Sequence, residues 1–211
     1  MKATKKTALA AAALAVQVAA LGWLVWRYES IVRDGTEVRF RCAAYDPYDP
    51  LRGRYLRTTV RETCSEIVGE QEGRGKMDAA YAKLVPSTNG LWRVAAVAKT
   101  PQPDGGLWIK PKWARTERSL QWSERGKNES WEDFQERREA SPLAVTVALP
   151  DQLFLNERLA PAAEKVLRDA TSAKGKGAVA VYRAKDGEIV ITDIEIDGKS
   201  VLARARETLM K

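Results

Sequence analysis

Few residues in this chain have the types and spacing needed for chemistry. The 211-residue sequence contains no histidine, which excludes a His-dependent catalytic triad, an imidazole acid/base and a His-ligated metal site. Its two cysteines, Cys42 and Cys64, are too few for a four-cysteine metal site and too widely spaced for a redox motif. We therefore expect no cofactor and no metal, and we identify no catalytic residue.

One catalytic class needs no histidine. A serine activated by a lysine amine is a nucleophile for hydrolysis, and a membrane-tethered domain can house such a dyad. The candidate serines are Ser65, Ser87 and Ser119, and the candidate lysines are Lys83, Lys110 and Lys112. Because sequence spacing does not rank these pairs, a Ser/Lys-type hydrolase remains the alternative to a non-enzymatic accessory or binding module.

The most distinctive segment contains two Asp-Pro steps. It reads Tyr45-Asp46-Pro47-Tyr48-Asp49-Pro50-Leu51-Arg52-Gly53-Arg54-Tyr55-Leu56. Each proline restricts its own backbone and that of the preceding aspartate, whereas Gly53 permits a positive φ or a close packing contact. On the residues alone, the segment predicts a rigid, polar connection between two strands.

This segment resembles the GDYXXLXY family of membrane-anchored proteins, which is named for a Gly-Asp-Tyr-x-x-Leu-x-Tyr signature that follows an Asp-Pro-rich run. The matching residues are Asp46, Pro47, Asp49, Pro50, Arg52, Gly53 and Tyr55. Three signature positions differ here, because Arg54, Thr58 and Val60 replace the aspartate, the leucine and the last tyrosine.

The resemblance is strongest over Ala8–Thr63. It transfers no activity. It implies a bacterial inner-membrane protein that faces the periplasm and a multi-pass membrane protein as its partner.

Alternating side chains predict strands on both sides of the Asp-Pro segment, over Glu37–Ala44 and Arg54–Cys64. Cys42 and Cys64 each lie on the apolar face of its predicted strand. If the strands pair antiparallel, the cysteines approach each other across the hairpin, and in an oxidising compartment we expect a disulfide. Two separate buried thiols are the alternative.

The N-terminal segment predicts a membrane anchor. Ala8–Trp26 is a run of 19 residues without a charge, and as a helix it would span about 28 Å, close to the thickness of a bilayer core. Trp23, Trp26 and Tyr28 follow at the end of the run, where aromatic rings favour the headgroup region. A cleaved signal peptide and a buried core helix are the alternatives.

Charge sets the expected orientation only weakly, because three lysines precede the run and four arginines follow soon after it. The basic tail followed by an apolar run is typical of an export signal. We therefore predict a cytoplasmic tail and membrane anchor over residues 1–33 and a periplasmic β-rich domain over residues 34–211. Without the tail lysines, 32 basic residues face 28 acidic ones, spread along the chain, so we expect no nucleic-acid partner.

The remaining sequence predicts an α+β fold: a single transmembrane helix, a mainly antiparallel β ectodomain and one amphipathic helix in the C-terminal half. Further hairpins are expected from Met77–Val85 with Leu91–Lys99 and from Ala178–Arg183 with Glu188–Asp197. The helix is expected near Leu159–Ala170, with Pro161 in its first turn.

Five of the seven tryptophans fall within 40 residues. They are Trp92, Trp108, Trp113, Trp122 and Trp131. Exposed along one groove, they would form a platform for a sugar or peptide, whereas cross-strand packing would place them inside an antiparallel domain. We favour packing.

Overall fold

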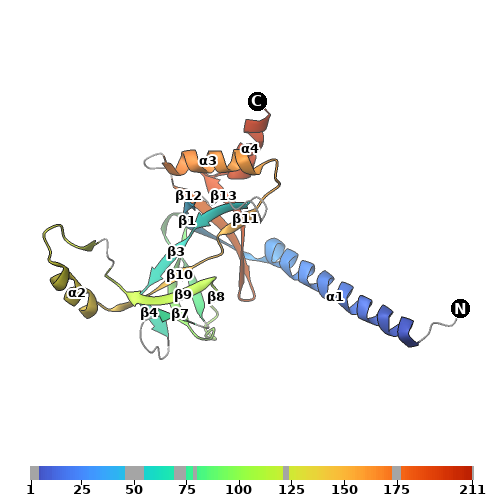
Figure 1. The fold of residues 1–211 in the computed structure, drawn as a ribbon, viewed down its shortest axis with the longest axis horizontal. Helices are drawn as coiled ribbons and strands as arrows, with labels where there is room; N and C mark the ends of the chain where they lie inside the picture. Colours follow the sequence, from blue (N-terminus) through green and yellow to red (C-terminus); the bar gives the residue numbers. More distant parts are fainter. Residues whose placement is uncertain are drawn as a thin grey trace.

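A long N-terminal helix leads into a β-rich body in the computed structural model of the chain (Figure 1). The structure describes residues 5–45, 55–68, 75–77, 80–120, 124–172 and 177–210. The helices in the described residues are α1 (Lys5–Asp34), α2 (Trp131–Ala140), α3 (Ala160–Ser172) and α4 (Val201–Leu209), and Thr88–Gly90 forms a 3₁₀ turn. This confirms the predicted α+β class and its leading helix.

Fourteen strands are seen in the described residues. They are β1 (Thr36–Tyr45), β2 (Tyr55–Thr59), β3 (Arg61–Cys64), β4 (Glu66–Val68), β5 (Gly75–Lys76), β6 (Tyr81–Pro86), β7 (Trp92–Ala98), β8 (Leu107–Ile109), β9 (Trp113–Arg118), β10 (Leu143–Ala148), β11 (Gln152–Phe154), β12 (Ala178–Lys185), β13 (Glu188–Ile196) and β14 (Lys199–Ser200).

These strands form three sheets. One has the order β11-β2-β1-β12-β13-β14, a second β3-β10-β9-β5 and a third β4-β7-β6-β8. All the neighbours pair antiparallel except β4 and β7, which are parallel. The expected hairpins are present as β6–β7 and β12–β13, which turn at Asn89-Gly90 and Asp186-Gly187 with positive φ angles.

The isoleucine spacing of β13 explains an irregularity in the largest sheet. Ile189 and Ile191 alternate, but the next pair, Ile194 and Ile196, is one residue out of phase. The register with β12 shifts at this point by one residue, at Thr192. The bulge keeps all four isoleucines buried, because without it the second pair would face the opposite side of the sheet.

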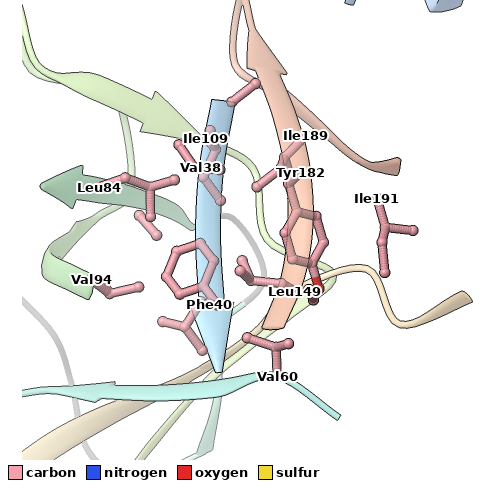
Figure 2. Packing of buried hydrophobic residues seen from close by; sticks show 14 of the residues in the cluster. Val38, Phe40, Val60, Leu84, Val94, Ile109, Leu149, Tyr182, Ile189 and Ile191 are labelled. Carbon is pink, nitrogen blue, oxygen red and sulfur yellow. The ribbon is translucent and has the colours of Figure 1, made fainter. Parts of the chain in front are cut away.

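The core lies on the face of β1 that carries Val38 and Phe40, both fully buried (Figure 2). Phe40 packs edge-on against Tyr182 of β12, with ring centroids 6.0 Å apart. Leu84 and Ile109 from the third sheet join the same cluster, which also includes residues of α3 and α4. One contiguous core therefore unites the three sheets and the C-terminal helices.

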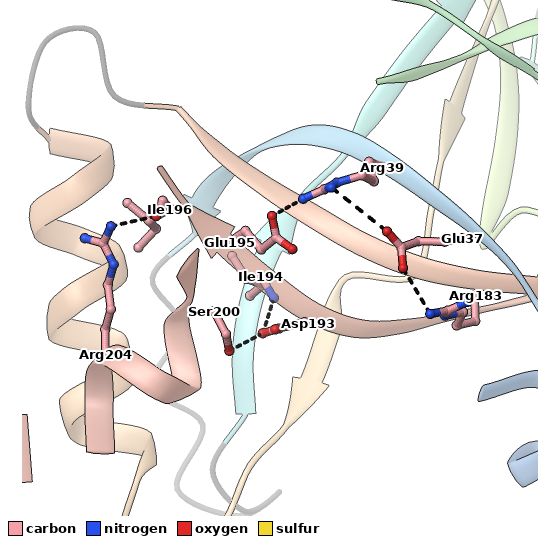
Figure 3. A network of polar contacts seen from close by, with 9 residues as sticks. All are labelled: Glu37, Arg39, Arg183, Asp193, Ile194, Glu195, Ile196, Ser200 and Arg204. Carbon is pink, nitrogen blue, oxygen red and sulfur yellow. Dashed lines mark hydrogen bonds and ion pairs between the residues drawn. The ribbon is translucent and has the colours of Figure 1, made fainter. Parts of the chain in front are cut away.

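The other face of β1 is polar. Glu37 and Arg39 form ion pairs with Arg183 of β12 and Glu195 of β13, which lie across the same sheet (Figure 3). All four side chains remain partly exposed. With one face in the core and the other in contact with solvent, β1 alternates between apolar and polar residues, which is the pattern that identifies this strand in the sequence.

Two helices lie together over one end of the six-stranded sheet (Figure 1). The predicted amphipathic helix is α3, which buries Ala163 and Leu167. The second, α4, was not predicted: Ser200 accepts a hydrogen bond from the backbone N–H of Leu202 at 3.2 Å and caps its start. A third helix, α2, lies within the charged segment that precedes β10 and buries Phe134.

Candidate functional site

The family-like motif lies only partly within the described residues. Asp46, Pro47, Asp49, Pro50, Arg52 and Gly53 fall outside them. Tyr55 begins β2, which pairs with β1 on one side and β11 on the other. The site can therefore be built from β2 and its neighbours.

Thr58 occupies the signature's leucine position and lies in the core. Its side chain is fully buried, on the same face as Leu56 and Val60. Nearby, the buried Tyr182 hydroxyl donates to the carbonyl oxygen of Pro150 at 2.8 Å, and burial raises the pKa of Tyr182 well above its usual value. This part of β2 is a structural element of the core.

The opposite side of β2 borders a cavity of about 100 Å³. Arg57 and Arg61 from β2 and β3, Lys112 and Trp113 at the start of β9, and Asp151 just before β11 line it. The cavity is much smaller than the roughly 300 Å³ or more of a typical pocket for a drug-sized ligand. We call this set of five residues the cationic pocket.

Backbone pairing holds the pocket in shape. The N–H of Thr58 donates to the carbonyl oxygen of Asp151 at 2.9 Å, and the N–H of Lys112 donates to Ala148 at the same distance. The N–H of Leu149 donates to Val60 at 3.3 Å. Three segments that are distant in sequence are thus fixed around one carboxylate.

Asp151 is the electrostatic centre of the pocket. Lys112 Nζ lies 2.6 Å from one carboxylate oxygen and Arg57 Nε lies 3.1 Å from the other. Partial burial alone would raise the pKa of Asp151, but the hydrogen bonds from Lys112 and Arg57 outweigh it and lower the pKa. Asp151 is therefore ionised at neutral pH.

Arg61 adds a third cation. Its guanidinium carbon lies 5.8 Å from the centroid of the Trp113 ring, within the range of a cation–π contact. Among the described residues, no carboxylate is paired with Arg61. The pocket is thus lined by three cationic side chains and one carboxylate, which two of the three contact.

The predicted disulfide between Cys42 and Cys64 is not formed in the structure, where both thiols are free. Ala43 of β1 pairs with Thr59 of β2, so this register places Val60, and not Cys64, opposite Cys42. The strand changes partners after Val60, and Cys64 pairs with Val145 in another sheet. Burial raises the pKa of Cys42 to about 12 and that of Cys64 to about 11.

The candidates for a Ser/Lys dyad are not brought together. Lys83 pairs with Asp104 at 2.8 Å, and Lys112 belongs to the cationic pocket. Among the described residues, no serine hydroxyl is hydrogen bonded to a lysine amine. The geometry gives the hydrolase alternative no support at the positions considered.

The four described tryptophans of the cluster lie on four different elements. Trp108 is buried against Ala96 and Ala98, and its indole N–H donates to Asp104 at 2.9 Å. Trp92 and Trp113 are half-buried, and Trp131 on α2 is exposed. Trp122 lies outside the described residues. The expected packing holds for Trp108.

Helix α1 meets the β-rich body at a defined junction. α1 is long and apolar enough to span a bilayer, and its apolar part is not buried against the protein. Arg27, the first charged residue after the apolar run, forms an ion pair with Glu188 at 2.9 Å. Further along, Asp34 pairs with Lys185 at 3.4 Å and Ile31 is buried.

The junction places the β12–β13 turn beside the end of the apolar run. Gly187 in this turn accepts a hydrogen bond from the N–H of Lys110 at 2.7 Å, so the connection between β8 and β9 lies there too. Trp23, Trp26 and Tyr28 are exposed on the same part of α1. These three aromatic side chains, the turn and Lys110 therefore lie around the same junction.

Sequence reasoning missed the cationic pocket because its residues come from three separate segments. Lys112 and Trp113 follow Pro111, and Asp151 follows Pro150, so each lies just beyond a proline at the edge of a strand. Proline at a strand end was the only local signal. The pairing of these segments is a tertiary feature.

The comparisons with known proteins agree with the motif. A protein-family model described as "GDYXXLXY protein" matches residues 17–194. Comparison with curated proteins and with solved structures finds no significant match. The matched region covers the end of α1 and most of the β-rich body, well over half of the chain. The chain therefore belongs to the GDYXXLXY protein family.

Proposed function

We propose that this chain is a single-span protein of the bacterial inner membrane whose β-rich domain lies in the periplasm. There it acts as a non-enzymatic accessory or binding module for a multi-pass membrane protein. The observation that carries the proposal is the junction between α1 and the β12–β13 turn, because a helix fastened by packing and ion pairs holds the domain in a set position.

The position of the junction supports a place beside the bilayer. An apolar run of 19 residues matches the thickness of the hydrocarbon core, so Arg27 would lie in the headgroup region. The side chain of Glu188 reaches Arg27, which brings the β12–β13 turn to the same level. A domain held there meets the extramembrane loops of a neighbouring membrane protein without a long linker.

The partner is tested by isolating the full chain in a mild detergent after crosslinking in intact cells. We expect one multi-pass membrane protein to co-purify in stoichiometric amounts. A chain that purifies alone as a monomer, with no crosslinked neighbour, would overturn the accessory function.

Sidedness is tested with single cysteines in intact cells. Lys110→Cys lies on the exposed turn beside the junction, and Lys5→Cys lies at the other end of α1. A maleimide that enters the periplasm but not the cytoplasm is expected to label Lys110→Cys and not Lys5→Cys. The opposite pattern would contradict the proposed orientation. The native thiols, half-buried at Cys42 and buried at Cys64, give little background.

A further inference from the structure

The cationic pocket has the composition of a binding site for a small oxyanion. Three positive side chains, Arg57, Arg61 and Lys112, line it together with a single carboxylate, that of Asp151. Only 16% of the Asp151 side chain is exposed, against 35% for Arg57 and 42% for Lys112. The negative charge is therefore enclosed, whereas the cations reach the opening.

Donors remain for an added ligand. Lysine carries three N–H donors, of which Lys112 gives one to Asp151, and arginine carries five in a planar fork. The Arg61 guanidinium contacts the Trp113 ring, and such a contact holds the planar fork in place. A pre-positioned fork beside an ammonium group is a suitable arrangement for the oxygens of a carboxylate or phosphate.

We propose that the cationic pocket binds one small oxyanion, a phosphate or carboxylate group, between Arg61 and Lys112 and against the edge of Trp113. In this arrangement, Asp151 positions Lys112 and Arg57. Its negative charge also competes with the oxyanion for these two cations. The volume of about 100 Å³ admits the anionic group alone, so any larger molecule that carries it must extend out of the opening. The inference is independent of the membrane partner.

Binding is tested by NMR on the full chain in nanodiscs of zwitterionic phosphatidylcholine. The probe is the indole N–H signal of Trp113, assigned with Trp113→Phe, during titration with inorganic phosphate and separately with acetate at constant ionic strength. We expect a saturable shift of this signal while the signals of buried Trp108 stay in place. The absence of a saturable shift with both anions would overturn the proposal.

Variants with opposite expected signs separate a binding site from a structural cluster. Arg61→Ala removes the cation that has no described carboxylate partner and should weaken binding about tenfold. Arg93→Ala removes an exposed arginine of β7 and should leave binding unchanged. Asp151→Asn removes the internal anion and should tighten binding about tenfold. Equal affinity in the Arg61 and Arg93 variants, or weaker binding in a folded Asp151→Asn protein, would overturn the proposal.

A final experiment distinguishes a lipid headgroup from a soluble anion, using nanodiscs that contain phosphatidylglycerol and no added phosphate. If these nanodiscs shift the Trp113 signal in the wild type and not in Arg61→Ala, the ligand is the lipid headgroup. If they leave the signal unchanged while phosphate still shifts it, the ligand is a soluble anion. Either result supports the site.

Discussion

Replacing Gly35 by alanine should loosen the junction between α1 and the β-rich body. Gly35 directly follows α1, and its N–H donates to the carbonyl oxygen of Ile31 at 2.9 Å. A Cβ atom at this position would clash with that oxygen and lie 3.2 Å from both the backbone nitrogen and the backbone oxygen of Ala184. Because all three neighbours are backbone atoms, no side chain can rotate away to make room.

The size of the effect follows from overpacking. Inserting a methyl group where the backbone must move costs about 2 kcal/mol, and for a domain of this size that lowers the midpoint of thermal unfolding by roughly 4–8 °C. The assay is thermal unfolding of the full chain in detergent, followed by near-UV circular dichroism. This signal reports the tertiary packing of the domain.

Two matched substitutions serve as controls. Gly22→Ala lies in α1, and Gly177→Ala lies just before β12, and in neither case would the new Cβ have any atom within 4 Å. Both variants should unfold within about 2 °C of the wild type, since they introduce no overpacking. If Gly35→Ala matches these controls, the close junction is not present and the argument for a fixed domain fails.

Two further predictions concern titratable groups that are at least half-buried. Burial raises the pKa of Glu62 in the folded protein, so the fold is more stable when this carboxyl is protonated; that stability is fully present below about pH 4 and is lost as the pH rises through the folded pKa. Glu62→Gln should therefore raise the free energy of unfolding at pH 7 and not at pH 4. An equal effect at the two pH values would refute this prediction. With pKa values of about 12 and about 11, Cys42 and Cys64 should react with iodoacetamide at pH 8 at least about 100-fold more slowly than in denaturant, and rapid labelling of the folded chain would contradict their burial.

The elements were predictable where local patterns determine them. The apolar run predicts α1, and the turn residues Asn89-Gly90 and Asp186-Gly187 predict two hairpins that the structure contains. The amphipathic spacing near Leu159 predicts α3. In each case the signal lies within one continuous stretch of sequence, and the neighbouring strand follows directly in the chain.

Predictions failed where a strand changes partners. The alternation of Arg54–Cys64 reads as one strand, but the chain splits at Val60 into β2 and β3, which belong to different sheets. This split carries Cys64 away from Cys42 and removes the expected disulfide. Nothing in the periodicity distinguishes one strand from two, because the alternation continues through the bend.

The C-terminal helix was missed for a related reason. The stretch after β13 is short, and α4 has only nine residues, with Val201 and Ala205 as its buried face. A helix of this length depends on packing more than on propensity, and its contacts with α3 and β13 are tertiary. The cap at Ser200 was the local signal available.

Depth measurement in proteoliposomes tests most directly whether α1 crosses the bilayer and holds the domain at its surface. A fluorophore is attached at Lys110→Cys, beside the junction, or at Glu207→Cys on α4, and quenching by lipids with spin-labelled headgroups is compared. We expect strong quenching at position 110 and little at position 207. Equal quenching at both positions, or none at either, would contradict the account.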